Sequence, residues 1–107
     1  MRKIEFFYWE DCPSHERALA ILREVMEEEG ITDSIAVIEV KTEDDARHYH
    51  FYGSPTIHVN GYDIVPPLED MAEPALTCRA YRRADGRISP LPPRELIVAA
   101  LRDTSRG

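Results

Sequence analysis

The residues best suited to chemistry in this sequence are its two cysteines, Cys12 and Cys78. Cys12 opens the motif C-P-S-H, which follows a short apolar segment and stands at the start of a helical pattern. Proline suits the first position of a helix, so Cys12 is expected at the N-cap. Free backbone N–H groups of Ser14 and His15 would then face its sulfur and stabilise a thiolate. The motif therefore predicts that Cys12 is a reactive thiol.

His15, three residues after Cys12, is the second candidate for a catalytic role. An imidazole beside a cysteine can stabilise the thiolate by its charge or by a hydrogen bond. The alternative for His15 is a polar residue of the first helical turn with no role in chemistry. For Cys12 the alternative is a small buried apolar residue, because free cysteines are often buried. Both alternatives stay open.

Cys78 is the third candidate, and its role depends on the course of the chain. The predicted strand at residues 62–65 runs back toward the end of the sheet where Cys12 is expected, and a dozen residues connect it to Cys78. Cys78 could then resolve an oxidised Cys12, provided that the two Cα atoms come within about 7 Å. A buried structural cysteine is the alternative.

Cys12 and His15 are also spaced like two of the four ligands of a metal site. Cys78, His48 or His50 would have to supply the remaining ligands. Two ligands at one helix start occur by chance, and the two later histidines are expected at a solvated helix end. No metal and no other cofactor is therefore predicted.

Alternating strands and helices position these residues. Apolar runs at residues 3–9 and 35–40 predict two strands, separated by a helix over residues 14–29 that ends at Gly30. Two strands joined through a helix are suited to parallel pairing with a right-handed crossover. The first third of the chain is thus expected to form a βαβ unit.

Antiparallel strands are expected after this unit. A short helix capped by Thr42 spans residue 43 to about residue 50 and is followed by a break at Gly-Ser-Pro. Segments 56–59 and 62–65 alternate around an Asn-Gly pair, which is typical of a hairpin with a two-residue turn. The sequence therefore predicts an α/β domain with a mixed sheet of about four strands, a parallel pair plus a hairpin, flanked by helices.

The last third of the chain has a weaker pattern. A β-ribbon is expected from residues 75–83 and 87–89, turned at an Asp-Gly pair. Pro92 and Pro93 then open a final helix, and residues 103–107 are expected to fray. All of residues 1–107 are assigned to a single domain, because a chain of this length supports one core.

The order strand, helix, strand, helix, hairpin, helix resembles the thioredoxin and glutaredoxin superfamily. Two segments carry the resemblance: K-I-E-F-F-Y-W-E-D-C-P-S-H and Y-G-S-P-T-I-H-V-N-G-Y-D-I. They take the positions of the family's cysteine motif and cis-proline segment, and the chain is most similar to small thioredoxin-like proteins with a C-P-x-C motif. The resemblance covers residues 1–65 well, whereas the ribbon before the last helix departs from it.

The resemblance implies that Cys12 is the active thiol and that the Ser54–Pro55 peptide bond is cis. It also implies four residues beside the substrate: Pro13, Ser54, Pro55 and Thr56. A routine loop proline is the alternative for Pro55. His15 stands where the family has its second cysteine, so an ordinary dithiol cycle within the motif is excluded.

The function that follows is thiol-dependent redox chemistry on a protein or small-molecule thiol or disulfide. Cys12 would form a mixed disulfide, and Cys78 or an external thiol would resolve it. The alternative is a thioredoxin-fold binding module that holds a peptide, metal or organometal in its cleft without turnover.

The composition excludes other classes of partner. A formal charge of −7 argues against nucleic-acid backbones and against anionic membrane surfaces. The N-terminal segment is too short for a signal-peptide core, and no apolar run approaches the roughly 20 residues of a membrane span. A cytoplasmic protein is expected, in which the cysteines are thiols or a transient redox pair. The sequence does not indicate the oligomeric state.

Overall fold

The computed structural model describes residues 3–65, 74–77, 81–82, 85–89 and 91–102. Within these ranges the fold is α/β, with a mixed sheet of four strands in the order β2-β1-β3-β4. The strands are β1 (Ile4–Tyr8), β2 (Ile35–Glu39), β3 (Thr56–Val59) and β4 (Tyr62–Asp63). β1 and β2 are parallel, whereas β3 is antiparallel to both β1 and β4. The predicted parallel pair and hairpin are confirmed.

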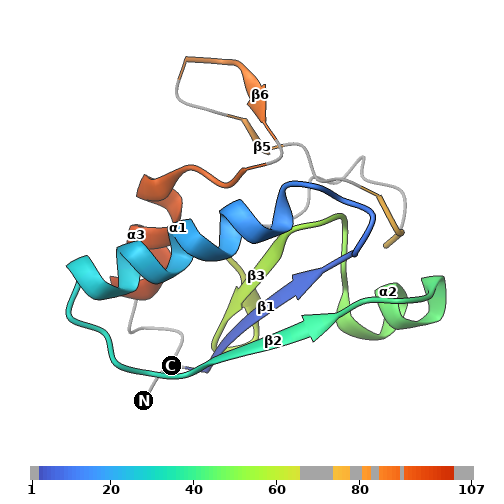
Figure 1. The fold of residues 1–107 in the computed structure, drawn as a ribbon, viewed down its shortest axis with the longest axis horizontal. Helices are drawn as coiled ribbons and strands as arrows, with labels where there is room; N and C mark the ends of the chain where they lie inside the picture. Colours follow the sequence, from blue (N-terminus) through green and yellow to red (C-terminus); the bar gives the residue numbers. More distant parts are fainter. Residues whose placement is uncertain (1–2, 66–73, 78–80, 83–84, 90, 103–107) are drawn as a thin grey trace.

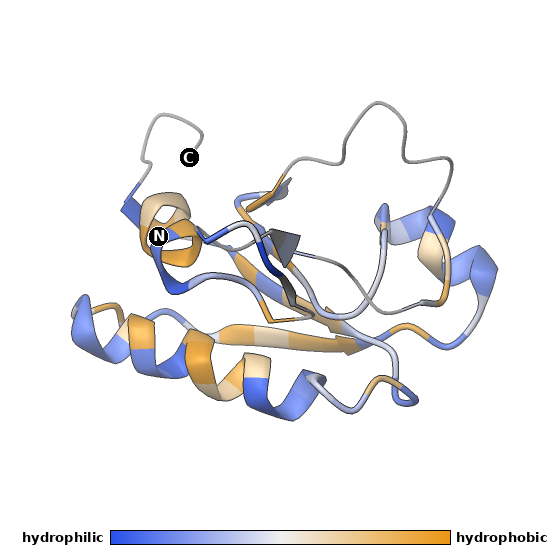
Figure 2. Ribbon diagram, turned by 90° about the horizontal axis from the view of Figure 1, so that it is seen from above, coloured by the Kyte–Doolittle hydropathy of each residue, from blue (hydrophilic) through white to orange (hydrophobic). Residues whose placement is uncertain are grey.

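Helices cover both faces of this sheet. Helix α1 (His15–Glu28) and helix α3 (Arg94–Arg102) pack on one face, and the short helix α2 (Glu43–Tyr49) packs on the other. In Figure 1, α1 and α3 lie above the strands and α2 lies to their right. Figure 2 shows hydrophobic and hydrophilic residues alternating along α1, whereas α2 is mostly hydrophilic. None of the helices in the described ranges is long and apolar enough to cross a membrane.

Strand β1 supplies side chains to both cores, because successive residues of a strand point to opposite faces. Ile4 and Phe6 join the cluster beneath α1 and α3, together with Leu22 and Ile97. Phe7 points the other way and joins the smaller cluster around Val40, Ala46 and Phe51. The site at the end of β1 is therefore anchored from two sides.

Helix α1 begins at a different cap from the predicted one but ends as predicted. Ser14, not Cys12, is the N-cap: its backbone is already helical (φ −86°, ψ −6°), and its carbonyl accepts from the N–H of Ala18 at 3.0 Å. At the other end Gly30 has φ +69°, and the N–H of Ile31 bonds to the carbonyl of Met26 at 2.8 Å. This is a left-handed glycine cap, as the sequence predicts.

The hairpin forms as predicted, but its second strand is shorter. Asn60 and Gly61 both have positive φ values, 55° and 84°, as a type I′ turn requires. Strand β4 ends at Asp63 instead of residue 65. The N–H of Ile64 still donates to the carbonyl of Ile57 in β3 at 3.0 Å, and the N–H of Val65 donates to the Asp63 carboxylate at 2.9 Å. A side chain that takes up a backbone N–H in this way competes with the sheet for it.

The ribbon is present in part. Strands β5 (Tyr81–Arg82) and β6 (Ile88–Ser89) pair antiparallel in a separate two-stranded sheet. Ala75 and Thr77, which were expected in the ribbon, instead bond to Phe51 and Ser54, ahead of β3. The predicted frayed tail, residues 103–107, lies outside the described residues.

Helices α1 and α3 are joined by ion pairs at their surface. The guanidinium of Arg102 donates twice to the carboxylate of Glu29, at 2.5 and 3.0 Å. Arg94 donates to Glu24 at 2.9 Å and to Glu28 at 2.7 Å. The hydrogen bond from Arg102 lowers the pKa of Glu29 below its ordinary value, against a smaller opposing effect of desolvation.

We expect Arg102→Ala to remove this shift and to destabilise the protein in a pH-dependent way. Since the pKa of Glu29 is lower in the folded state, its stabilising effect is present above the ordinary glutamate pKa of about 4.3 and is lost as the pH falls. The difference in free energy of unfolding between the parent and the variant should be largest at neutral pH. Urea denaturation at several pH values measures it.

Arg17→Ala is the matched control, because Arg17 lies exposed on α1 and makes no ion pair with a described residue. It should leave the pH profile of stability unchanged. Equal profiles for both variants would contradict the assigned role of the Arg102–Glu29 pair.

Candidate functional site

Cys12 lies in the turn between β1 and α1 and is fully buried. Its N–H donates to the carbonyl of Trp9 at 3.0 Å, which closes the turn. Its thiol Sγ lies 3.5 Å from the carbonyl oxygen of Ser54, to which it donates a hydrogen bond. The end of β1 and the segment before β3 are thus joined through the sulfur.

The hydrogen-bond partner of the Cys12 sulfur differs from the one that the sequence predicts. Ser14 occupies the N-cap, and the described contact of the sulfur is the Ser54 carbonyl. A carbonyl oxygen only accepts, so the S–H group is the donor in this bond.

His15 is the first residue of α1, but it does not pair with Cys12. Its ring stacks on Tyr8, with 4.6 Å between the ring centroids and 26° between the planes. The described residues show no hydrogen bond between His15 and the sulfur. Burial raises the pKa of the Tyr8 phenol, and the carboxylates of Glu39 and Glu10 raise it further. His15 thus faces a neutral aromatic ring at physiological pH.

The Ser54–Pro55 peptide bond is cis, as predicted, and the residues around it are buried. The Ser54 hydroxyl accepts from the N–H of Trp9 at 3.0 Å. The Thr56 hydroxyl donates to the carbonyl of Gly53 at 2.6 Å. Of the four predicted substrate-binding residues, Ser54, Pro55 and Thr56 therefore form one fixed segment beside Cys12, whereas Pro13 is exposed.

A second stretch of the chain binds to this segment. The N–H of Ser54 donates to the carbonyl of Thr77 at 2.7 Å, and the N–H of Ala75 donates to the carbonyl of Phe51 at 3.1 Å. Thr77 directly precedes Cys78 in the sequence, while Cys78 itself lies outside the described residues. The predicted Cys12–Cys78 pair therefore lies partly outside the described residues.

Tyr81 is a residue of the site that sequence reasoning missed. It is buried, and its hydroxyl donates to the carbonyl of Pro55 at 2.5 Å. A tyrosine in a weakly patterned ribbon gives no signal for such a contact. Trp9 was assigned to the strand only, yet its N–H holds the Ser54 side chain.

The described residues contain no group of three or more His, Cys, Asp or Glu side chains that could hold a metal ion. His48 and His50 lie exposed at the C-terminal end of α2, where His48 packs edge-on against Tyr49. Of the residues named for the metal alternative, only Cys78 lies outside the described residues.

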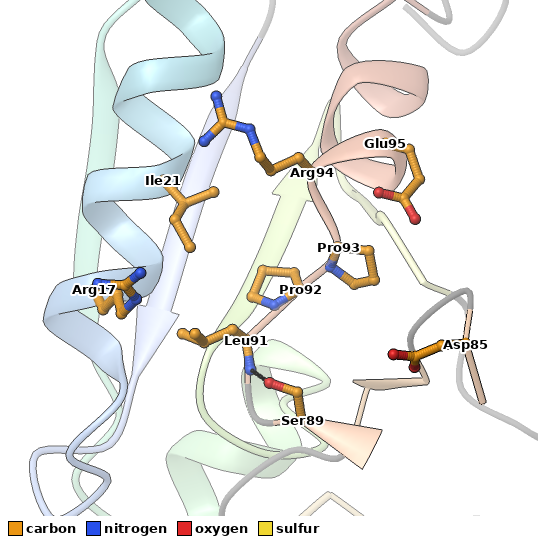
Figure 3. A pocket seen from close by; sticks show the side chains of 9 residues that line it. All are labelled: Arg17, Ile21, Asp85, Ser89, Leu91, Pro92, Pro93, Arg94 and Glu95. Atoms are coloured by element: carbon orange, nitrogen blue, oxygen red, sulfur yellow. Dashed lines mark hydrogen bonds between the residues drawn. The ribbon is translucent and has the colours of Figure 1, made fainter. Parts of the chain in front are cut away.

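A cavity of about 500 Å³ lies apart from this site, between α1 and the segment that leads into α3 (Figure 3). In Figure 3, Arg17 and Ile21 of α1 face Leu91 and Pro92 across it. None of the predicted site residues lines it. The cavity therefore gives no support for substrate binding at Cys12.

Comparison of the chain with protein-family models, with curated proteins and with solved structures finds no match. The function has to be argued from the geometry of the site.

The burial of Cys12 leads to a prediction about its reactivity. In a Cys78→Ser variant, iodoacetamide should modify Cys12 at least about tenfold more slowly in the native protein than in the unfolded chain, because local opening must precede reaction. This differs from the sequence-based expectation that Cys12 is a reactive thiol. Mass spectrometry of timed samples measures both rates, and equal rates would show that Cys12 is open to solvent.

A further prediction concerns Tyr81. Tyr81→Phe removes the hydroxyl that donates to the Pro55 carbonyl and should lower the free energy of unfolding by about 1–3 kcal/mol, since a buried acceptor loses a partner. Tyr62→Phe is the control, because Tyr62 is 54% exposed and its change should be within about 0.5 kcal/mol. Urea denaturation compares the two. A similar loss in both variants would mean that the Tyr81 hydroxyl has no special role.

Proposed function

We propose that this chain is a thiol–disulfide redox protein with a thioredoxin-like fold, in which Cys12 exchanges with a disulfide and Cys78 resolves the product. The observation that carries the proposal is the double role of Ser54. Its carbonyl accepts from the Cys12 thiol, and its N–H donates to Thr77, the neighbour of Cys78 in the sequence. The backbone of this single residue therefore bonds to Cys12 and to the residue that precedes Cys78.

The fold supports the same proposal. A parallel pair, a helix on each face and an antiparallel hairpin are the elements that the resemblance implies. Cys12 follows the central strand β1, and the Ser54–Pro55 segment lies directly against it, as the resemblance leads one to expect. His15 does not contact the sulfur, so the proposal gives it no part in activating the thiol.

The proposed reaction begins when the Cys12 S–H leaves the Ser54 carbonyl and loses its proton to solvent. The thiolate attacks one sulfur of a substrate disulfide, a Cys12–substrate bond forms, and the other substrate sulfur leaves as a thiolate. The Cys78 thiolate then attacks the Cys12 sulfur, forms the Cys12–Cys78 disulfide and releases the second substrate thiolate. The substrate gains two electrons and the protein loses two, which an external dithiol restores. Reduced cysteines of this kind fit a cytoplasmic protein.

The test is oxidation of the reduced protein with diamide in the presence of glutathione. We expect the mass of the monomer to fall by two hydrogens and peptide mapping to give a fragment that links Cys12 to Cys78. Cys12→Ser and Cys78→Ser should each abolish the link. A glutathione adduct on Cys12 alone, or disulfide-linked dimers, would contradict a resolving role for Cys78.

A non-catalytic binding module is the second candidate, and one observation favours it. The Cys12 thiol is fully buried, and the backbone N–H of Ser54 is occupied by Thr77 of the same chain. Turnover of a small aromatic disulfide with dithiothreitol as reductant distinguishes the candidates. Activity that is lost in Cys12→Ser supports the redox protein, whereas equal background rates in both proteins support the binding module.

A further inference from the structure

The outer edge of strand β2 is unpaired within the described part of the chain. β2 is the first strand in the sheet order, and Figure 1 shows it at the lower edge of the sheet. The N–H of Val40 donates to the carbonyl of Tyr8 at 2.8 Å. In a parallel pair alternate residues bond to the neighbouring strand, so Ala36 and Ile38 bond toward β1 as Val40 does. The N–H and C=O groups of the odd-numbered residues 35, 37 and 39 therefore point outward.

The side chains of β2 do not protect this edge. Natural edge strands usually carry a lysine, a proline or a bulge that prevents pairing with another chain. The β2 sequence, I-A-V-I-E, has no lysine, proline or bulge, its one charged residue is Glu39 at the end, and all five residues pair in register with β1. Val37, at its centre, is 44% exposed, although it is a large apolar residue. A regular apolar edge of this kind is a template for another strand.

We propose that a second copy of this chain pairs with β2 in antiparallel orientation, about a two-fold axis at Val37. Val37 then lies opposite Val37 of the other copy, and Ile35 lies opposite Glu39. All three are residues with outward backbone groups, so each opposed pair exchanges both of its hydrogen bonds. The contact is self-complementary, as a two-fold interface requires.

Charge complementarity favours this register. One further pair out, Asp33 before the strand lies opposite Lys41 after it, and the symmetry repeats this pair at the other end. Opposite charges on facing strand positions are stabilising, whereas like charges are destabilising.

The proposal rests on the sheet alone and is independent of the redox chemistry of Cys12. Sedimentation velocity over a range of concentrations tests it, in buffer of about 0.15 M salt so that the net negative charge is screened. We expect a reversible dimer. Val37→Lys places two like charges at the two-fold axis and should weaken the dimer at least about tenfold. Tyr62→Lys, at the exposed residue of the opposite edge strand, should leave the dimer unchanged.

The register is tested by exchange of charges. Asp33→Lys and Lys41→Asp should each weaken the dimer, because each places like charges opposite one another, and the double variant should restore it. Circular dichroism checks that every variant is folded. Amide exchange gives a backbone measurement: the N–H groups of residues 35, 37 and 39 should become protected as the dimer forms.

Three results would overturn the proposal. A monomer at every concentration would show that the second copy does not bind, even if an added peptide then protected the same amides. Equal loss of the dimer in Val37→Lys and Tyr62→Lys would place the interface elsewhere. Failure of the double charge exchange to restore the dimer would exclude the Val37 register.

Discussion

Strand β1 has neighbours on both edges and apolar cover on both faces, and these requirements place the other elements. β2 and β3 satisfy its backbone groups, each of which would cost about 1–3 kcal/mol if it were buried without a partner. Phe6 and Phe7 point to opposite cores, so a helix is needed on each side. Because β1 ends where β3 begins, the turn that holds Cys12 meets the segment that holds Ser54. The candidate site follows from the way this one strand is buried.

The same packing encloses Cys12, whose side chain is fully buried and whose thiol donates to the Ser54 carbonyl. The proposed exchange reaction requires that this bond breaks. The neighbouring segment is held in turn by the Ser54 N–H, the Trp9 N–H and the Tyr81 hydroxyl. Modification of the Cys12 sulfur would therefore affect the backbone at Ser54 first, because the Ser54 carbonyl would lose its hydrogen-bond donor.

Local patterns predicted the parts of the fold that depend on local rules. The helical spacing of α1, its glycine cap and the Asn-Gly turn all follow from short-range geometry and appear as expected. The four-stranded sheet could also be predicted, because a helix between two strands favours their parallel pairing. The lengths of strands follow local rules less closely, and β4 ends at Asp63, two residues before the predicted end.

The contacts of the site were harder to predict because they join distant parts of the chain. The stacking of His15 on Tyr8 depends on how β1 and α1 meet in space, and the spacing from Cys12 carries no information about it. Thr77 was expected in the ribbon because its neighbourhood alternates, yet it bonds to Ser54. In both cases a contact with a distant part of the chain determines where the residue lies, and the local sequence pattern does not show that contact.

The early end of β4 affects how far such a sheet can extend between molecules. A sheet with two long free edges can add neighbours on both sides and grow into an open polymer. Here β4 has only two residues, so this edge offers a very short template. If copies pair through β2 as proposed, growth stops once that edge is used. The shortness of β4 thus acts against fibre formation.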